Sequence, residues 1–210
     1  MFARHQASLF DIADVPTIEP LGGALTRTEL GAGAWLDTCP SWLRGSAGLF
    51  DELLRSVPWR RERRPMYDRV VDVPRLVCYY PDGIALPHPL LTELRDALSR
   101  HYAPELGERF TTAGLCCYRD GSDSVAWHGD TAGRGADTDT MVAIVSLGAA
   151  RPLLLRPRGG GAASLRYPQG HGDLLVMGGS CQRTWEHCVP KTAQPIGPRI
   201  SVQFRPRGVR

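Results

Sequence analysis

The half of the chain that follows Phe110 consists of short strand-like segments separated by turn signals, and this pattern constrains the possible folds most. Eight segments are predicted as β-strands, at residues 111–119, 125–128, 141–147, 152–156, 164–167, 173–177, 182–187 and 200–205. Short strands at this spacing are typical of a β-sandwich, a jelly roll or a barrel. The sequence lacks βαβ alternation and a G-x-x-x-x-G-K phosphate loop, which argues against a doubly wound nucleotide-binding fold.

The first 110 residues are predicted to mix helices with less regular sequence. The expected elements are helices at 46–57 and 89–102, a basic loop at 58–65, and strands at 70–73 and 75–80. Apolar side chains recur at helical spacing in both helical segments, where Pro58 follows the first segment and Pro89 begins the second.

Residues 1–45 show no strong periodicity and are predicted to be an irregular N-terminal extension. The remainder is expected to be a single domain over 46–210, because 210 residues suit one domain with a modest extension. Within it, a lid and helices are expected at 46–110 and the β-rich core at 111–207.

Charge alone does not identify a partner. The 25 basic residues are 24 arginines and one lysine, Lys191, and the net charge is only +3. Codon bias explains most of this excess, and the alternative is that arginine is used for fork-shaped recognition of carboxylate or phosphate. The first 54 residues hold seven acidic residues and three arginines, so an acidic start masks a basic remainder.

Cysteine usage indicates a reducing compartment. The six cysteines form no C-x-x-C pair, and no secretory leader or membrane-spanning apolar run is visible. We therefore expect reduced thiols and a cytoplasmic protein.

Three residues form a candidate metal site. His128-Gly129-Asp130 ends a predicted strand, and residues i and i+2 of an extended chain point to the same side. His187, on a later strand, is the best candidate for a third ligand. Two histidines and one carboxylate form the facial triad that leaves positions open on Fe(II) for a co-substrate and O₂. His-x-Asp also occurs by chance, and a hydrogen-bonded structural histidine is the alternative for each imidazole.

Two arginines strengthen this interpretation. Arg199 and Arg205 lie six residues apart on the last predicted strand, so both project to one face. An inward-facing arginine needs an anionic partner, because an unpaired buried charge is prohibitive, and a dicarboxylic co-substrate supplies that partner with bidentate geometry. The alternative is that both arginines line a solvated strand face.

The order and spacing of these residues resemble the AlkB family of iron(II)- and 2-oxoglutarate-dependent dioxygenases. The resemblance extends over about residues 58–207, with matching segments at 73–76, 118–130, 143–149, 171–177, 185–187 and 199–205. It implies an α+β, mainly β fold, in which a double-stranded β-helix (jelly roll) follows N-terminal helices and a substrate-lid region. It also implies that Fe(II) is bound by His128, Asp130 and His187.

The resemblance further implies how the co-substrate is held. Arg199 would pair with the far carboxylate of 2-oxoglutarate, Arg205 would lie nearby, and Tyr118 would hydrogen-bond the co-substrate. O₂ would convert 2-oxoglutarate to succinate and CO₂ while an N-alkyl group is hydroxylated and then lost as an aldehyde, which restores the base. Cys116 stands where the family usually has an asparagine, so one co-substrate contact is weaker here.

The substrate end of the resemblance departs further from the family. Thr131 stands where an acidic residue often follows the metal motif, and residues 84–86 lack the usual aromatic rings. The candidate substrate-contacting residues are Trp59, Tyr79, Tyr80, His88, Trp127 and Thr131.

Nucleic acid, with DNA preferred, is the predicted substrate. An enzyme that acts on a base needs cations along the backbone and an aromatic platform. Trp59 with the arginines of 60–64, and the acid-free stretch 151–166, fit these requirements, although a core tryptophan and solvated arginines are the alternative. The predicted activity is oxidative removal of alkyl groups from nucleic-acid bases, as in alkylation damage repair.

Other functions stay open. The same iron chemistry could act on a protein or a small molecule, and a catalytically silent nucleic-acid-binding jelly roll is a different class. A zinc hydrolase built on the same three ligands is less expected, because it gives Arg199 and Arg205 no role.

Overall fold

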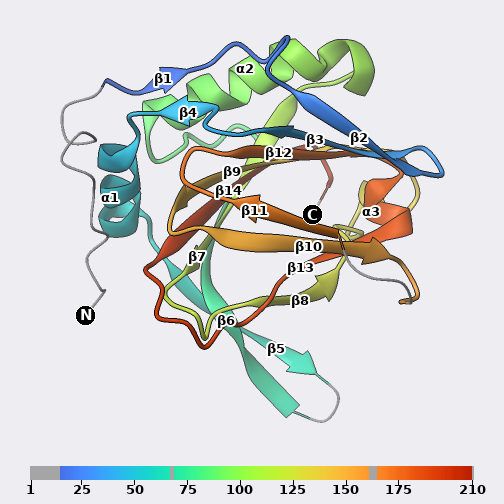
Figure 1. Cartoon of the computed structure of the whole chain (residues 1–210). Coiled ribbons are helices and arrows are strands. Elements are labelled where there is room, and N and C mark those ends of the chain that lie inside the picture. The colour runs from blue at the N-terminus through green and yellow to red at the C-terminus, as the bar shows by residue number, and fades with distance from the viewer. Residues whose placement is uncertain (1–14, 67–68, 161–164, 210) are drawn as a thin grey trace.

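The computed structural model describes residues 15–66, 69–160 and 165–209, with the backbone alone described at 64–66 and 69–72. These residues are mainly β with few helices, which confirms the predicted class (Figure 1). The strands are β1 (Thr17–Ile18), β2 (Thr26–Gly31), β3 (Ala34–Cys39), β4 (Leu43–Arg44), β5 (Arg60–Met66), β6 (Arg69–Tyr80), β7 (Phe110–Tyr118), β8 (Val125–His128), β9 (Val142–Gly148), β10 (Arg151–Pro157), β11 (Leu165–Gln169), β12 (Leu174–Gly179), β13 (Trp185–Val189) and β14 (Arg199–Pro206). The helices are α1 (Ala47–Ser56), α2 (Pro89–Leu106), α3 (Cys181–Thr184) and the 3-10 helix η1 (Arg134–Ala136).

An eight-stranded sheet forms the centre of the molecule, in the order β2-β3-β12-β9-β14-β7-β6-β5. All of its strand pairs are antiparallel. Every residue of β9 is buried, and its nearly continuous apolar sequence is typical of a strand that is covered on both faces.

The two faces of this sheet belong to two hydrophobic clusters, because successive side chains of a strand alternate between faces. On one face, residues such as Val145 pack with Phe50 of α1 and Leu94 of α2. On the other face, residues such as Ile144 pack with Leu155 of β10. The helices therefore cover one side of the sheet, and the opposite side faces a second sheet.

The second sheet has four antiparallel strands in the order β11-β10-β13-β8. In Figure 1 it lies in front of the central strands of the larger sheet. Within it, β13 pairs with β8 so that His187 lies directly opposite His128. The space between the two sheets is where the candidate site lies.

Both predicted helices are confirmed, and their ends follow from local sequence. α1 ends just before Pro58. α2 begins with Pro89 at its first position and runs past the predicted end at residue 102, until Gly107 adopts a left-handed conformation with φ 72°.

The prediction of an irregular N-terminal extension is wrong for residues 15–45. β2 and β3 form a hairpin whose turn has positive φ at Gly31, Ala32 and Gly33, and β3 pairs with β12 of the large sheet. β2 is an edge strand with the polar sequence Thr-Arg-Thr-Glu-Leu-Gly, so it lacks the apolar alternation that predicts a strand. Residues 1–14 lie outside the described residues.

Two smaller predictions also need correction. Most of the predicted basic loop at 58–65 is the edge strand β5, whose arginines hide the strand pattern. The predicted strand at 182–187 begins inside the short helix α3, and only at Trp185 does the chain become extended.

All six cysteines have free thiols. Within the described residues, no helix combines the length and the apolarity that crossing a bilayer requires.

Candidate metal and co-substrate site

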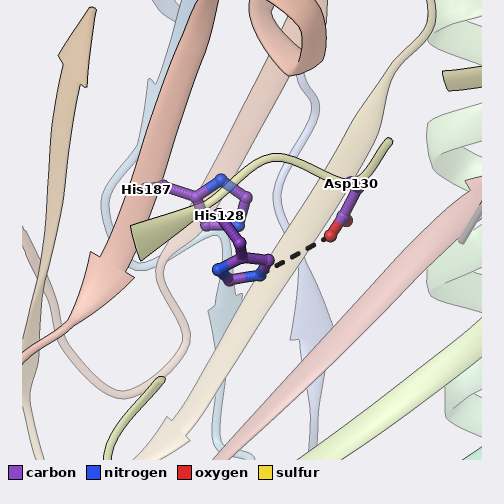
Figure 2. Close-up of side chains that lie close together, drawn as sticks. All are labelled: His128, Asp130 and His187. Carbon is purple, nitrogen blue, oxygen red and sulfur yellow. Dashed lines mark ion pairs between the residues drawn. The ribbon is translucent and has the colours of Figure 1, made fainter. Parts of the chain in front are cut away.

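The paired strands β8 and β13 bring the three predicted metal ligands together. The rings of His128 and His187 lie with their centroids 4.3 Å apart, and Asp130 Oδ1 is 3.7 Å from His128 Nε2. One donor atom from each residue lies within 4.8 Å of the others. Figure 2 shows the two imidazoles side by side with the carboxylate facing His128.

Gly129 lets the two neighbouring ligands sit against α3 (Cys181–Thr184). A Cβ atom at this position would lie 2.3 Å from the carbonyl oxygen of Gln182 and 2.7 Å from Arg158 Nη2. The side chain of Gln182 also accepts a hydrogen bond of 2.8 Å from the Asp130 backbone N–H. The helix α3 therefore fixes the backbone between His128 and Asp130.

Hydrogen bonding leaves both imidazoles able to bind a cation. His128 Nδ1 donates to the Ala126 carbonyl oxygen at 2.8 Å, which directs its Nε2 atom toward Asp130. Burial lowers the pKa of His187 to about 3, with His128 and Arg205 adding to the effect. His187 is therefore neutral at physiological pH, and its nitrogen lone pair is available to a metal.

Asp130 is held as a buried carboxylate by Arg205. Arg205 Nε donates to Asp130 Oδ2 at 2.8 Å, and its Nη2 atom lies 2.6 Å from the same oxygen as an ion pair. Burial acts to raise the pKa of Asp130, but Arg205 and the two imidazoles outweigh it and hold that pKa well below its usual range. Arg205 thus fixes the charge and orientation of a candidate ligand, as partners beyond the direct ligands do in metal sites.

Arg199 lies in the same space without an anionic partner. It is 2% exposed, and Nη2 donates to Ser146 Oγ at 2.7 Å. Its Nε and Nη1 atoms have no hydrogen-bond partner among the described residues. Burial lowers the pKa of Arg199, and the ring of Tyr118 lies 5.3 Å from the guanidinium carbon. Such a group needs an anion to complete its interactions.

A cavity of about 1040 Å³ connects these groups. Besides the three candidate ligands and the two arginines, it is lined by the predicted residues Cys116, Tyr118, Tyr79, Tyr80 and Thr131. The structure therefore gathers most of the predicted site residues around one space.

Three predicted substrate residues lie elsewhere. Trp59 packs against the helix-covered hydrophobic cluster. His88 caps α2, where its Nδ1 accepts the Leu90 N–H at 3.1 Å. Trp127 neighbours His128 on β8, so it points to the other face of the strand. There the guanidinium carbon of Arg156 lies 4.3 Å from the centroid of its ring. Strand alternation beside His128 already indicates this opposite face from the sequence.

Several residues that support or line the site were not predicted from the sequence. Ser146 supports Arg199, Gln182 supports Asp130, and Gln203 accepts from Arg205 Nη2 at 2.9 Å. Arg75 also lines the cavity. These residues become recognisable only from strand register, since Ser146, Ser201 and Cys116 lie in one row across β9, β14 and β7.

The fold and the donor set define a class of mononuclear metal oxygenases that use an acidic co-substrate. The sequence pattern of the 2OG-Fe(II) oxygenase superfamily matches residues 77–205. The chain belongs to this superfamily, and its relatives make it an AlkB-like member.

The relatives extend beyond the part that matches this chain. The chain is 30% identical over 202 residues to alpha-ketoglutarate-dependent dioxygenase alkB homolog 3 of Bos taurus, which covers 81% of this chain and 67% of the relative. It is 32% identical over 193 residues to DNA oxidative demethylase ALKBH2 of Arabidopsis thaliana, a match that covers 74% of this chain and 60% of the relative. The chain thus spans about two thirds or less of the length of these relatives. The solved structure of OsALKBH1 shares the fold, with a TM-score of 0.62, 12% identity, and coverage of 87% of this chain and 100% of that one.

The superfamily implies Fe(II) and 2-oxoglutarate, and the residues present fit both groups. Two imidazoles and one carboxylate are the donors that suit Fe(II). The unpaired N–H groups of Arg199 suit a carboxylate, with which guanidinium forms bidentate pairs.

Proposed function

We propose that the chain is an Fe(II)- and 2-oxoglutarate-dependent dioxygenase that oxidatively removes alkyl groups from nucleic-acid bases. The observation that carries this proposal is the buried guanidinium of Arg199, which faces the cavity of the three candidate ligands and lacks an anionic partner among the described residues. A dicarboxylic co-substrate would provide that partner, whereas a hydrolytic metal site gives this arginine no role.

The two facing sheets support a more specific description of the fold. In this proposal they form a double-stranded β-helix, or jelly roll, and the cavity between them is its interior. The β5–β6 hairpin and the turn that follows β6 would form the substrate lid. Arg61 and Tyr79 of the hairpin, and Ile84 of the turn, line the cavity.

The residues of the chain have separate tasks in the reaction. When bound, Fe(II) with 2-oxoglutarate supplies the activation of O₂ that hydroxylates the alkyl carbon, after which the alkyl group leaves as an aldehyde. His128, Asp130 and His187 would hold the metal, and Arg205 keeps Asp130 ionised and oriented. Arg199 and Tyr118 would fix the far end of the co-substrate, and the apolar walls of the cavity would exclude water.

A nucleic-acid substrate is supported by the outer part of the cavity and by the relatives. Arg60 and Arg61 are exposed on β5 and line the cavity, as does Tyr79, which is 42% exposed. In Figure 1, β5 and the adjoining part of β6 project from the body of the molecule. Cations beside an exposed ring suit a phosphate backbone and an unstacked base. One relative is named a DNA oxidative demethylase, which favours DNA.

The test is turnover on methylated oligonucleotides. The Fe(II)-loaded chain, given 2-oxoglutarate and O₂, is expected to release formaldehyde and succinate in equal amounts from single-stranded or double-stranded oligonucleotides that carry N-methylated bases. His128→Ala should abolish both products. Succinate formed without any change in DNA or RNA oligonucleotides would favour a protein or small-molecule substrate. Oligonucleotide binding without Fe(II)-dependent products would favour a silent binding module.

A further inference from the structure

The loop that follows the candidate ligand Asp130 packs against the segment that follows β14. This loop, called the metal loop below, spans residues 131–137 and includes η1. Its first two residues, Thr131 and Ala132, line the cavity together with the candidate ligands. The metal loop is therefore part of the wall of the site, and a contact that fixes this loop also shapes the site.

Two backbone contacts join the metal loop to residues 207–209. Gly133 and Val209 form an isolated antiparallel bridge. The Arg134 N–H donates to the Gly208 carbonyl oxygen at 2.9 Å. Gly133 has φ 75°, and a Cβ atom on it would lie only 2.2 Å from the same Gly208 oxygen. The two segments therefore run too close together for a side chain to fit between them at Gly133.

The side chain of Val209 anchors this contact in the core. Val209 is fully buried and belongs to the same hydrophobic cluster as Met177 and Cys181. The two residues before it, Arg207 and Gly208, are exposed. Because burial of an apolar side chain is favourable, Val209 is the residue that holds this short segment, and with it the metal loop, against the body of the molecule.

Gly135 connects Val209 to the candidate ligand. Gly135 is buried, and a Cβ atom on it would lie 2.2 Å from the Asp130 carbonyl oxygen and 3.6 Å from Val209 Cγ1. The main chain of Asp130 and the side chain of Val209 thus both pack against the same side of Gly135. Loss of the valine side chain would give the loop room to move at the point where it touches Asp130.

The last strand and the residues after it therefore contact Asp130 in two ways. Arg205 of β14 donates from Nε to the Asp130 carboxylate at 2.8 Å. Four residues later, Val209 supports the backbone of the loop that begins at Asp130. The Asp130 N–H is held separately by Gln182 of α3. The carboxylate, the N–H and the carbonyl side of this residue thus each have their own support.

We infer that Val209 is a positioning residue for the metal site, where it holds the metal loop so that Asp130 and Thr131 keep their places beside His128 and His187. This inference rests on the proposed function, since it assigns Val209 to the metal site of that reaction. Val209 acts through Gly135 and the loop backbone, and has no contact with the metal itself.

The experiment combines calorimetry with Mn(II), which replaces Fe(II) at the same donors, and hydrogen exchange of the metal-free chain. Val209→Ala removes two buried methyl groups. It is expected to weaken Mn(II) binding by about tenfold, the loss typical of a change in a residue that supports a metal ligand. It should also speed amide exchange in peptides that cover residues 131–138, while peptides from β9 keep the rate of the parent chain.

Two variants serve as matched controls. Arg207→Ala changes an exposed residue of the same segment and should alter neither Mn(II) affinity nor exchange in the metal loop. Val57→Ala removes the same methyl groups from the helix-covered cluster at the end of α1, where Val57 is 4% exposed. It should lower the urea midpoint without weakening Mn(II) binding, so it separates global destabilisation from release of the metal loop.

The parent chain offers a measurement that needs no variant and serves where Val209→Ala does not fold. The Arg134 amide is expected to exchange slowly in the metal-free chain, because it donates to the Gly208 carbonyl oxygen. An Arg134 amide that exchanges as fast as an open loop would overturn the inference.

The other outcomes are also distinct. A Val209→Ala chain that binds Mn(II) as tightly as the parent would overturn the inference alone, and so would an equal loss of affinity in Val57→Ala. A parent chain that does not bind Mn(II) would overturn both the inference and the proposed function. Weaker Mn(II) binding in Val209→Ala alone, in a parent chain that changes no oligonucleotide, would support the inference and overturn the proposed substrate.

Discussion

His187 is the candidate ligand whose charge state depends most on burial, and this gives a prediction for the metal-free chain. Its pKa is about 3 in the folded chain, against 6.5 for an unperturbed imidazole. Between these values the unfolded chain binds a proton that the folded chain does not bind. The free energy of unfolding should therefore fall as the pH drops from 6.5 toward 3, by up to about 1.4 kcal/mol per pH unit from this group.

Urea denaturation of the metal-free chain at a series of pH values measures this slope. His187→Gln removes the titrating group, so its unfolding free energy should depend less steeply on pH between pH 6.5 and about pH 4. Equal slopes in the parent and the variant would show that His187 is not held neutral by the fold.

Single residues were predictable from sequence where chemistry and short-range spacing coincide. His128 and Asp130 are two residues apart at the end of β8, and this short spacing in the chain keeps them together. Arg75 reaches the cavity, and Ser146 reaches Arg199, only through the pairing of distant strands, which a single sequence does not reveal. His88 does not line the cavity; its side chain caps α2, a role consistent with its position before Pro89.

At the scale of elements, a network of side-chain ion pairs connects the β2–β3 hairpin to α2. Arg27 of β2 donates to both carboxylate oxygens of Asp37 in β3 at 2.8 Å and to Glu105 of α2 at 2.8 and 2.9 Å. The Tyr102 hydroxyl also donates to Asp37 at 3.0 Å, and Asp37 is 2% exposed. The buried carboxylate is therefore the centre of the connection.

Asp37→Ala is expected to lower the free energy of unfolding by about 2–3 kcal/mol, because it leaves a buried hydroxyl and a half-buried guanidinium without their acceptor. Glu105→Ala removes the other carboxylate of Arg27, but that side chain is 41% exposed. Its effect should stay below about 1 kcal/mol, as for exposed ion pairs. Urea denaturation measures both. Similar losses in the two variants would contradict a central role for Asp37.

The predictability of an element depended on how completely it is buried on one face. β9 and α2 have strong apolar patterns because they pack against a core, and both were predicted. β2 and β5 are the two edges of the large sheet, where polar and arginine side chains conceal the strand periodicity. Their pairing partners, rather than their own sequence, make them strands.

At the scale of the whole molecule, the two faces of the large sheet differ: one packs against the helices and the other carries the candidate site. The face under α1 and α2 is packed mostly with apolar side chains, while the face toward the small sheet carries the cavity with the candidate metal ligands and Arg199. Both faces depend on the same central strands. A change that removes the support of these strands on the helix side should therefore also damage the site.

Removal of residues 1–45 tests this dependence and the predicted domain boundary at 46. It deletes β3, which pairs with β12 along Ala34–Cys39, and with it the buried side chains of Trp35, Leu36 and Trp42. The fragment 46–210 would expose the backbone edge of β12 and the adjoining core, which favours aggregation. We expect it to lack a cooperative urea transition by circular dichroism and to lose Mn(II) binding by calorimetry, whereas the full chain has both. A fragment that unfolds cooperatively and binds the metal would contradict this and would establish residues 1–45 as a dispensable extension.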